Sequence, residues 1–260
     1  MVPRGLDLSA RLSSVLEVIY LIFNEGYSAT VGEELTRISL CEEALRLGRI
    51  VAELEPRQPE VHGLVALMEI QASRSRARVS STGEPILLMD QDRALWDQLL
   101  IRRGLDALDR ANALTPARRP YRLQAEIAAC HARAINAAET DWGRIVSLYV
   151  ELAAIAPSPV VGLNRAVAVS RHAGPLPALE LLEPLREDPL MKSYHLLPSV
   201  RGDLLSRLGR HAEARAEFEL AAGMTQNTRE RQLLIDRRAS ARRRRTKHPS
   251  ETVRLRRLAA

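Results

Sequence analysis

The chain has few cysteines, few aromatic residues and no long apolar run, and each shortage excludes a class of protein. Only Cys41 and Cys130 are cysteines among 260 residues, which excludes the disulfide framework of a small secreted domain. Aromatic residues make up 3%, whereas β-sandwiches and β-barrels are rich in them. No apolar run reaches the roughly 18 residues that span a membrane, and the first residues lack the pattern of a signal peptide. We therefore expect a cytoplasmic protein that has no membrane partner.

The sequence also lacks the short motifs of common catalytic and cofactor sites. It has no G-x-G-x-x-G or G-x-x-x-x-G-K-[ST] loop, no H-E-x-x-H or paired C-x-x-C motif, and no G-x-S-x-G turn. His131 follows Cys130, but neighbouring residues on a helix point about 100° apart and do not easily face one metal ion. We expect Cys130 to be a core residue, and we expect no enzymatic activity, no cofactor and no metal ion.

Basic charge is concentrated at the C-terminal end of the chain. The formal net charge is +6, yet residues 237–260 contain ten Lys and Arg residues against one acidic residue and so carry +9. Residues 1–236 therefore carry −3. We expect residues 237–260 to be a basic, disordered tail that could bind phosphate groups without reading base sequence. The candidate nonspecific phosphate contacts are Arg242, Arg243, Arg244 and Arg245.

Apolar residues recur with a helical period of 3.6 along most of the chain, and Leu, Ala, Arg and Glu are plentiful. The pattern predicts helices at about residues 8–24, 33–54, 59–78, 92–114, 120–137, 142–155, 159–171, 175–186, 195–208, 211–223 and 227–239. The first helix is so hydrophobic that we expect it to be buried on most sides. No alternating strand pattern is present. The sequence therefore predicts an all-α fold.

An internal repeat organises the second half of the chain. A shift of 36 residues aligns two segments, and the aligned pairs are Arg165 and Arg201, Arg171 and Arg207, Ala178 and Ala214, and Leu182 and Phe218. The second copy looks like a tetratricopeptide repeat (TPR) unit, in which Gly209 turns the chain and small Ala214 lets the second helix approach closely. We expect stacked antiparallel helical hairpins, TPR-like in the C-terminal half, with a concave face.

Four polar clusters interrupt the apolar helices and supply the candidate interaction residues. They are Asn24-Glu25-Gly26-Tyr27, Asp90-Gln91-Asp92-Arg93 with the following Trp96, Thr140-Asp141-Trp142, and Asn164-Arg165. We expect Asp90 or Asp92 to cap the helix that contains Trp96, and the second cluster's two close carboxylates also suit acid–base catalysis or a cation site. Thr140 is a natural N-cap. Arg165 could pair with a carboxylate of another cluster across the interior, or it could line a binding groove.

Seven motifs occur in order along the chain. They are YLIFNEGY (20–27), EVHGLVALM (60–68), DQDRALW (90–96), RPYRLQAEIAACHA (119–132), TDWGRIVSLY (140–149), PSPVVGLNRAVAV (157–169) and LLSRLGR (204–210). Together they resemble the C-terminal extension of bacterial extracytoplasmic-function RNA polymerase sigma factors of the sigma-70 type. In that family two promoter-reading helical domains precede the extension, and the resemblance implies that this chain lacks both.

The resemblance and the repeat together divide the chain into four segments. Residues 1–7 are expected to be the remnant of a linker, and residues 8–116 the N-terminal helical part of the extension. Residues 117–236 are expected to form TPR-like hairpins, and residues 237–260 the basic tail.

The resemblance implies a regulatory protein-interaction domain of a sigma factor that acts in transcription initiation. Its expected partners are the sigma-factor DNA-reading domains or RNA polymerase, with nucleic acid bound only indirectly or through the basic tail. The alternative is a helical ligand-sensing or enzymatic domain. Its polar pocket would gather Glu25, Asp90, Asp92, Asp141 and Arg165. A third hypothesis is nonspecific nucleic-acid binding through residues 237–257.

Overall fold

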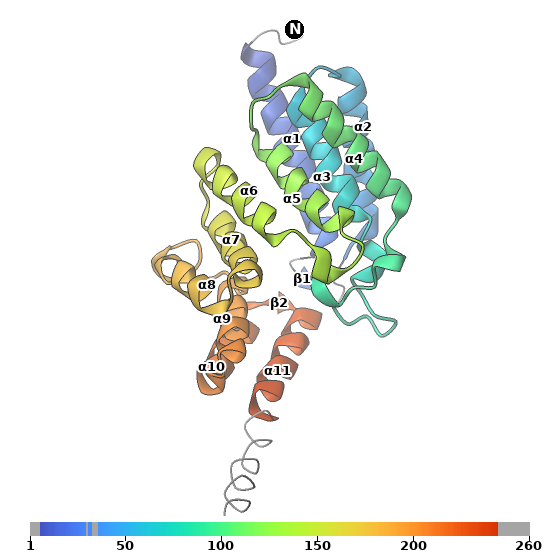
Figure 1. Ribbon diagram of the computed structural model, residues 1–260. Helices are drawn as coiled ribbons and strands as arrows, with labels where there is room; N and C mark the ends of the chain where they lie inside the picture. Colours follow the sequence, from blue (N-terminus) through green and yellow to red (C-terminus); the bar gives the residue numbers. More distant parts are fainter. Residues whose placement is uncertain (1–5, 30, 33–35, 244–260) are drawn as a thin grey trace, which may run out of the picture. The chain divides into compact units, whose positions relative to one another are not determined.

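The computed structural model describes residues 6–29, 31–32 and 36–243, and it describes the side chains of residues 11–29 and 36–239 (Figure 1). The described chain is predominantly helical, which confirms the predicted all-α fold. It divides into two compact units, residues 1–161 and residues 162–260, and each unit is considered by itself. Within the described part, no helix is both long enough and apolar enough to cross a membrane.

The first unit is built from the helices α1 to α6. Their bounds are α1 Leu6–Tyr27, α2 Ile38–Leu54, α3 Pro59–Ala72, α4 Gln98–Leu114, α5 Pro120–Arg133 and α6 Trp142–Ile155. Short elements between them are β1 (Val31–Gly32) and the 3₁₀ helices η1 (Ser75–Ala77), η2 (Leu88–Asp90), η3 (Arg93–Leu95) and η4 (Ala137–Glu139). The expected boundary between residues 116 and 117 falls between α4 and α5, inside this unit.

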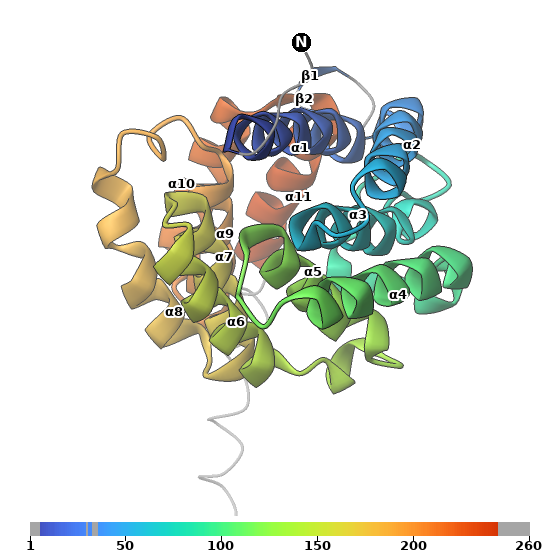
Figure 2. The ribbon, with the colours of Figure 1, turned by 90° about the horizontal axis from the view of Figure 1, so that it is seen from above.

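Helix α3 is the central element of the first unit. It packs against α1, α2, α4 and α5, and Figure 2 shows it between these neighbours. Leu64 and Met68 join one core with α1 and α2, whereas Val65 and Ile70 join a second core with α4 and α5. The contact with α5 needs Gly63, because a Cβ there would lie 2.8 Å from the backbone nitrogen of Arg122. Burial on all sides explains why α3 has no polar face.

Helix α1 is less buried than its sequence predicts. Leu16, Ile19 and Phe23 lie in the core shared with α2 and α3. Val18 and Leu21, however, are 55% and 60% exposed. The prediction that this helix is buried on most sides is therefore wrong, because within its unit α1 packs through a single stripe.

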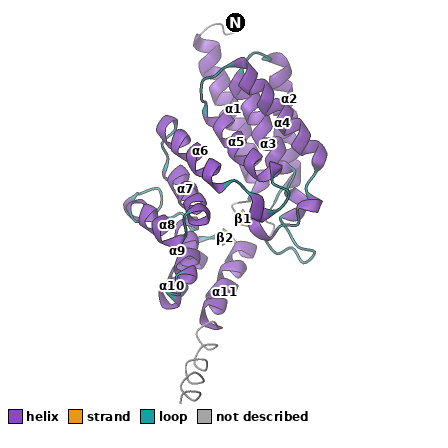
Figure 3. Cartoon of the chain, viewed as in Figure 1, coloured by secondary structure: helices purple, strands orange, loops and turns teal. Residues whose placement is uncertain are grey.

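The second unit begins within α7 and contains five α-helices in its described part. Their bounds are α7 Pro159–His172, α8 Pro175–Leu182, α9 Leu196–Arg207, α10 His211–Met224 and α11 Thr228–Arg243. Two short elements, η5 (Pro184–Glu187) and β2 (Gln226–Asn227), complete it. Figure 3 shows the helices and the loops that join them. Because α11 continues to Arg243, residues 237–243 of the expected disordered tail are helical, and residues 244–260 lie outside the described residues.

The repeat found in the sequence coincides with the core of the second unit. Ala178 and Leu182 in α8 and their repeat partners Ala214 and Phe218 in α10 are all buried in one cluster. Gly209 adopts a φ of +77° between α9 and α10, a conformation that a residue without a Cβ adopts readily. These contacts confirm packed helical hairpins in this part of the chain.

Candidate functional site

Tyr27, at the end of α1, lies against two arginines. The guanidinium carbon of Arg78 is 3.6 Å from the centre of the Tyr27 ring, and that of Arg74 is 5.7 Å away. The other partner of the ring is Phe23, stacked at 5.6 Å between ring centres. Arg78 also donates a hydrogen bond to the Tyr27 carbonyl. A cation is favourable here because the last carbonyls of a helix carry partial negative charge.

Trp96, which is 3% exposed, is the second aromatic residue of this region. The guanidinium carbons of Arg74 and Arg93 lie 5.8 Å and 4.8 Å from the centre of its ring system. Arg93 donates from Nη1 to the carbonyls of His131 and Ala134 at 2.5 and 2.6 Å. These bonds fasten η3 to the C-terminal end of α5, again with a cation at the carbonyl end of a helix.

His131 connects this region to the third aromatic residue, Trp142. The two rings meet edge to face with their centres 5.2 Å apart. Burial lowers the pKa of His131 to about 3, and the charges of Arg74 and Arg93 act in the same direction. His131 is therefore neutral near pH 7.

We call these residues the arginine–aromatic cluster. Its members are Tyr27, Arg74, Arg78, Arg93, Trp96, His131 and Trp142. The structure thus brings together three of the candidates chosen from the sequence, Tyr27, Trp96 and Trp142. Of the residues that connect them, Arg93 belongs to the second polar cluster, whereas Arg74, Arg78 and His131 lie in none of the four clusters.

The capping expectations for this region need correction. Trp96 precedes α4, whose N-cap is Asp97, with the Asp97 carboxylate accepting from the backbone nitrogen of Leu99 at 2.8 Å. Asp92 instead caps the short helix η3 by accepting from Ala94 at 2.9 Å. Asp90 is exposed and caps neither helix.

The N-cap of α6 is Asp141 and not Thr140. The Asp141 carboxylate accepts from the backbone nitrogen of Arg144 at 2.8 Å. The Thr140 hydroxyl accepts from Nη2 of Arg93 at 3.1 Å, so it serves the arginine–aromatic cluster instead.

The remaining candidates have separate local surroundings. Asn24 hydrogen-bonds Tyr20 on its own helix, and Glu25 forms an ion pair with Arg37 at 3.1 Å. Gln91 is buried and donates to the carbonyl of Ile86 at 3.2 Å. The carboxylates Glu25, Asp92 and Asp141 thus each have their own local partner in the first unit.

Two candidates lie in the second unit. Asn164 is exposed and Arg165 half-buried on α7, and within the described residues Arg165 forms no ion pair. The side chains of Arg242 and Arg243, and all of Arg244 and Arg245, lie outside the described part of the chain. No three His, Cys, Asp or Glu side chains among those described could hold one metal ion.

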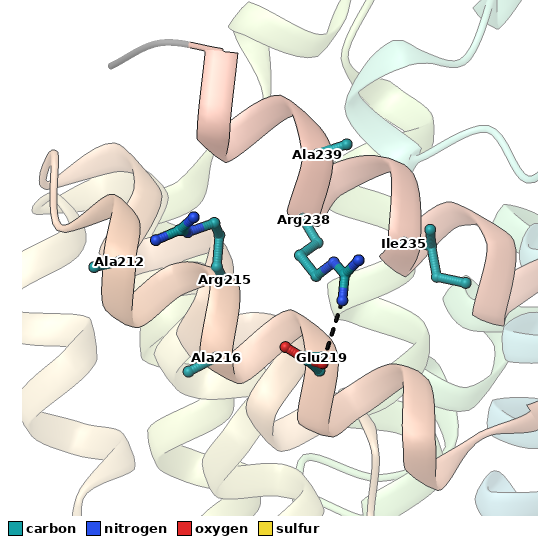
Figure 4. Close-up of a pocket in the computed structure, with 7 residues that line it drawn as sticks. All are labelled: Ala212, Arg215, Ala216, Glu219, Ile235, Arg238 and Ala239. Carbon is teal, nitrogen blue, oxygen red and sulfur yellow. Dashed lines mark ion pairs between the residues drawn. The ribbon is translucent and has the colours of Figure 1, made fainter. Parts of the chain in front are cut away.

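The second unit has a groove between α10 and α11 that the sequence analysis missed. Its cavity volume is about 410 Å³, and the residues that line it are Ala212, Arg215, Ala216, Glu219, Ile235, Arg238 and Ala239. Figure 4 shows Arg238 reaching from α11 toward Glu219 on α10, with 3.2 Å between the paired atoms. The sequence does contain a signal that could have indicated this groove. Ala212 and Ala216 are spaced one helical turn apart, and the helix beside them is very basic.

The comparisons with known proteins give a partial match to a family model and a longer match to one relative. Residues 11–112 match the model described as a family of unknown function, DUF6596. The chain is also 46% identical over 229 residues to the uncharacterized protein R00370 of Rhizobium meliloti (strain 1021). That similarity covers 88% of this chain and 53% of the relative, so the chain spans about half the length of the curated relative it matches.

These matches correct the resemblance to sigma factors. DUF6596 is a distinct family, and neither match indicates a relationship to sigma factors. The motifs that suggested a relationship to sigma factors lie on packed helices and their caps. Packing and capping restrict the choice of residues at such positions, whatever the function of the protein. The DUF6596 match reaches from α1 to α4. It includes Tyr27, Arg74, Arg78, Arg93 and Trp96, and it ends before the helices that carry the other members of the arginine–aromatic cluster.

Proposed function

We propose that the chain is a protein-interaction domain, and that the α10–α11 groove binds an acidic helical segment of a partner protein. The observation that carries this proposal is the groove itself, whose small side chains are bordered by basic ones. Binding a partner helix in a groove is a common mode of peptide recognition, in which the fold supplies a preformed surface.

The shape of the groove suits a helix. Ala212 and Ala216 are exposed on consecutive turns of α10, so a partner backbone could approach closely there. Ile235, 38% exposed on α11, offers an apolar contact beside them. The volume of about 410 Å³ is enough for several side chains of a bound helix.

The charge of the groove favours an acidic partner. Its lining contains two arginines, Arg215 and Arg238, and one carboxylate, Glu219. Arg215 forms no ion pair within the described chain and so remains available to a carboxylate. Charge complementarity of this kind raises the association rate and excludes basic partners. A protein is favoured over nucleic acid because Ala212, Ala216 and Ile235 give the groove a small-residue and apolar lining, which suits the apolar face of an amphipathic helix and offers nothing to a phosphate.

The test uses the full chain and two fluorescent amphipathic peptides, one with Glu and one with Lys on its polar face. Fluorescence anisotropy should show binding of the Glu peptide alone. Arg215→Glu should weaken that binding at least about tenfold, because an attraction becomes a repulsion. The matched control is Arg102→Glu, which reverses an exposed charge on α4 and should leave the affinity unchanged.

A second pair of variants separates the groove from general basic charge. Ala216→Phe should fill the groove without changing any charge and should weaken binding, whereas Ala113→Phe, on an exposed position of α4, should not. A short DNA duplex that binds more tightly than the Glu peptide would contradict the proposal. Equal effects of the groove and control variants would also contradict it.

A further inference from the structure

We infer that the arginine–aromatic cluster is a binding site for a small oxyanion of the phosphate type, held by Arg74, Arg93 and Trp96. This inference concerns the first unit and does not depend on the proposed groove of the second. Three observations carry it: an arginine whose donors are unused, buried nitrogen atoms without partners, and repulsion between two neighbouring guanidinium groups.

Arg74 supplies the unused donors. Its guanidinium carbon is near two aromatic rings, 5.7 Å from the centre of the Tyr27 ring and 5.8 Å from that of Trp96. Within the described residues, the guanidinium group makes no hydrogen bond and no ion pair. The aromatic contacts therefore hold it in place while its N–H groups stay available. A guanidinium fixed in this way is preorganised for two-point contact with an oxyanion.

Buried nitrogen atoms of the same cluster also lack partners. They are Nε of Arg93, Nε1 of Trp96 and Nδ1 of His131, none of which has a hydrogen-bond partner in the described part of the protein. The Arg93 and Trp96 atoms can only donate, and His131 donates from Nδ1 in one of its two neutral tautomers. Buried donors without an acceptor are costly and therefore rare. An oxyanion offers several acceptor atoms and, bound here, would accept from the Arg93 and Trp96 donors.

The guanidinium groups of Arg74 and Arg93 lie close enough to repel each other. Burial lowers the pKa of Arg93, and the nearby Arg74 lowers it further, whereas Glu139 opposes these effects more weakly. The carboxylates of Asp92, Asp97 and Asp141 keep their charge but accept from backbone N–H groups at helix starts, and within the described residues none of them pairs with Arg74 or Arg93.

Backbone carbonyls at helix ends do not offset the repulsion at Arg74 or at Nε of Arg93. The carbonyls at the end of α5 occupy Nη1 of Arg93, and the Tyr27 carbonyl accepts from Arg78. Neither group of carbonyls reaches Arg74 or Nε of Arg93 within hydrogen-bond distance. Repulsion between Arg74 and Arg93 is what a bound anion would relieve.

Trp96 provides a direct readout because the chain has only two tryptophans. In a ¹⁵N-correlated NMR spectrum of the full chain, the indole N–H signals of Trp96 and Trp142 are assigned with a Trp142→Phe variant. Titration with inorganic phosphate at constant ionic strength should shift the Trp96 signal until it saturates. A parallel titration with glycerol 3-phosphate distinguishes the free ion from a phosphate group on a larger molecule. Saturation by either supports the site.

Two neighbouring arginines give a matched pair of variants. Arg74→Gln should abolish the saturable shift, and phosphate should no longer raise the melting temperature. Arg76→Gln, an exposed position two residues away, should behave like the wild type. Arg74→Lys keeps the charge but loses the planar fork and should weaken binding at least about tenfold. A shift that sodium chloride reproduces, or one that persists in Arg74→Gln, would overturn the inference.

Discussion

At the scale of single residues, arginine satisfies the carbonyl ends of helices in the first unit. Arg78 donates to the last carbonyl of α1, and Arg93 donates to two carbonyls at the end of α5. The last carbonyls of a helix have no partner within it, so a side chain that reaches them removes an unsatisfied acceptor. Arg93 also fixes the loop before α4, because its side chain joins η3 to the C-terminal end of α5.

The surroundings of His131 make stability depend on pH. Its pKa is about 3 in the fold and 6.5 in its unperturbed state. Between these values the unfolded chain binds a proton that the folded chain does not, so stability falls as the pH drops from 6.5 toward 3. The full effect is on the order of 5 kcal/mol.

His131→Phe should remove this acid sensitivity while keeping the edge-to-face contact with Trp142. Thermal melts in phosphate-free buffer at pH 7 and about pH 4.5 should show the variant losing less stability than the wild type on acidification. Exposed His172, changed to Phe, is the control and should keep the wild-type dependence. Equal acid sensitivity of His131→Phe and the wild type would show that His131 titrates normally.

The same residues show which part of the cluster can be predicted from sequence. Aromatic residues make up only 3% of the chain, so Tyr27, Trp96 and Trp142 each stand out. The arginines do not stand out among 38 Lys and Arg residues. Arg93 contacts a carbonyl 38 residues away, and such a contact depends on the path of the chain between the two. The choice of Asp97 over Asp92 as the cap of α4 likewise depends on where the loop turns into the helix.

At the scale of elements, helices with a 3.6-residue pattern and clear end signals are predicted well. Helix α6 has the expected bounds, and α3 and α5 begin at prolines, as expected. The 3₁₀ helices are absorbed into longer predicted helices or loops because three residues are too few to show a period. This is why the sequence predicts one helix over 59–78 and another over 92–114, although α3 ends at Ala72 and α4 begins at Gln98.

Arg201 joins three elements of the second unit. From α9, its Nε lies 2.9 Å from the Glu217 carboxylate on α10, and its Nη1 pairs with Glu183 at the end of α8. Its side chain is only 9% exposed, so Arg201→Met would leave the largely buried Glu217 carboxylate without its partner. We expect a loss of about 1–3 kcal/mol in the free energy of unfolding, measured by urea denaturation followed by circular dichroism.

The repeat supplies the control for Arg201. Arg165 occupies the equivalent position on α7 and forms no ion pair within the described residues. Arg165→Met should therefore change the stability by less than about 0.5 kcal/mol. Adding Glu217→Gln to Arg201→Met should recover part of the loss by removing the unpaired charge. A loss of similar size in Arg165→Met and Arg201→Met would contradict the assigned role of the ion pairs.

At the scale of the whole molecule, each compact unit has a hydrophobic core of its own. The core of the second unit contains Leu182, Leu204 and Phe218, and the first unit has separate clusters around α3. The units divide within α7, where an uninterrupted helix carries no linker composition. The sequence therefore predicts the repeat inside the second unit but gives no signal of the residue at which that unit begins.

Separate cores predict separate unfolding transitions, and the distribution of tryptophan makes them distinguishable. Both tryptophans lie in the first unit, so their fluorescence reports that unit, whereas far-ultraviolet circular dichroism reports the helices of both. Phe218→Ala removes a 2% exposed ring from the second core and should cost about 3–5 kcal/mol there. In urea, this variant should move a circular dichroism transition to lower concentration and leave the fluorescence midpoint unchanged. Leu64→Ala, in the first core, should move the fluorescence midpoint instead. If Phe218→Ala moved both signals by the same amount, the two cores would have to unfold as one cooperative unit.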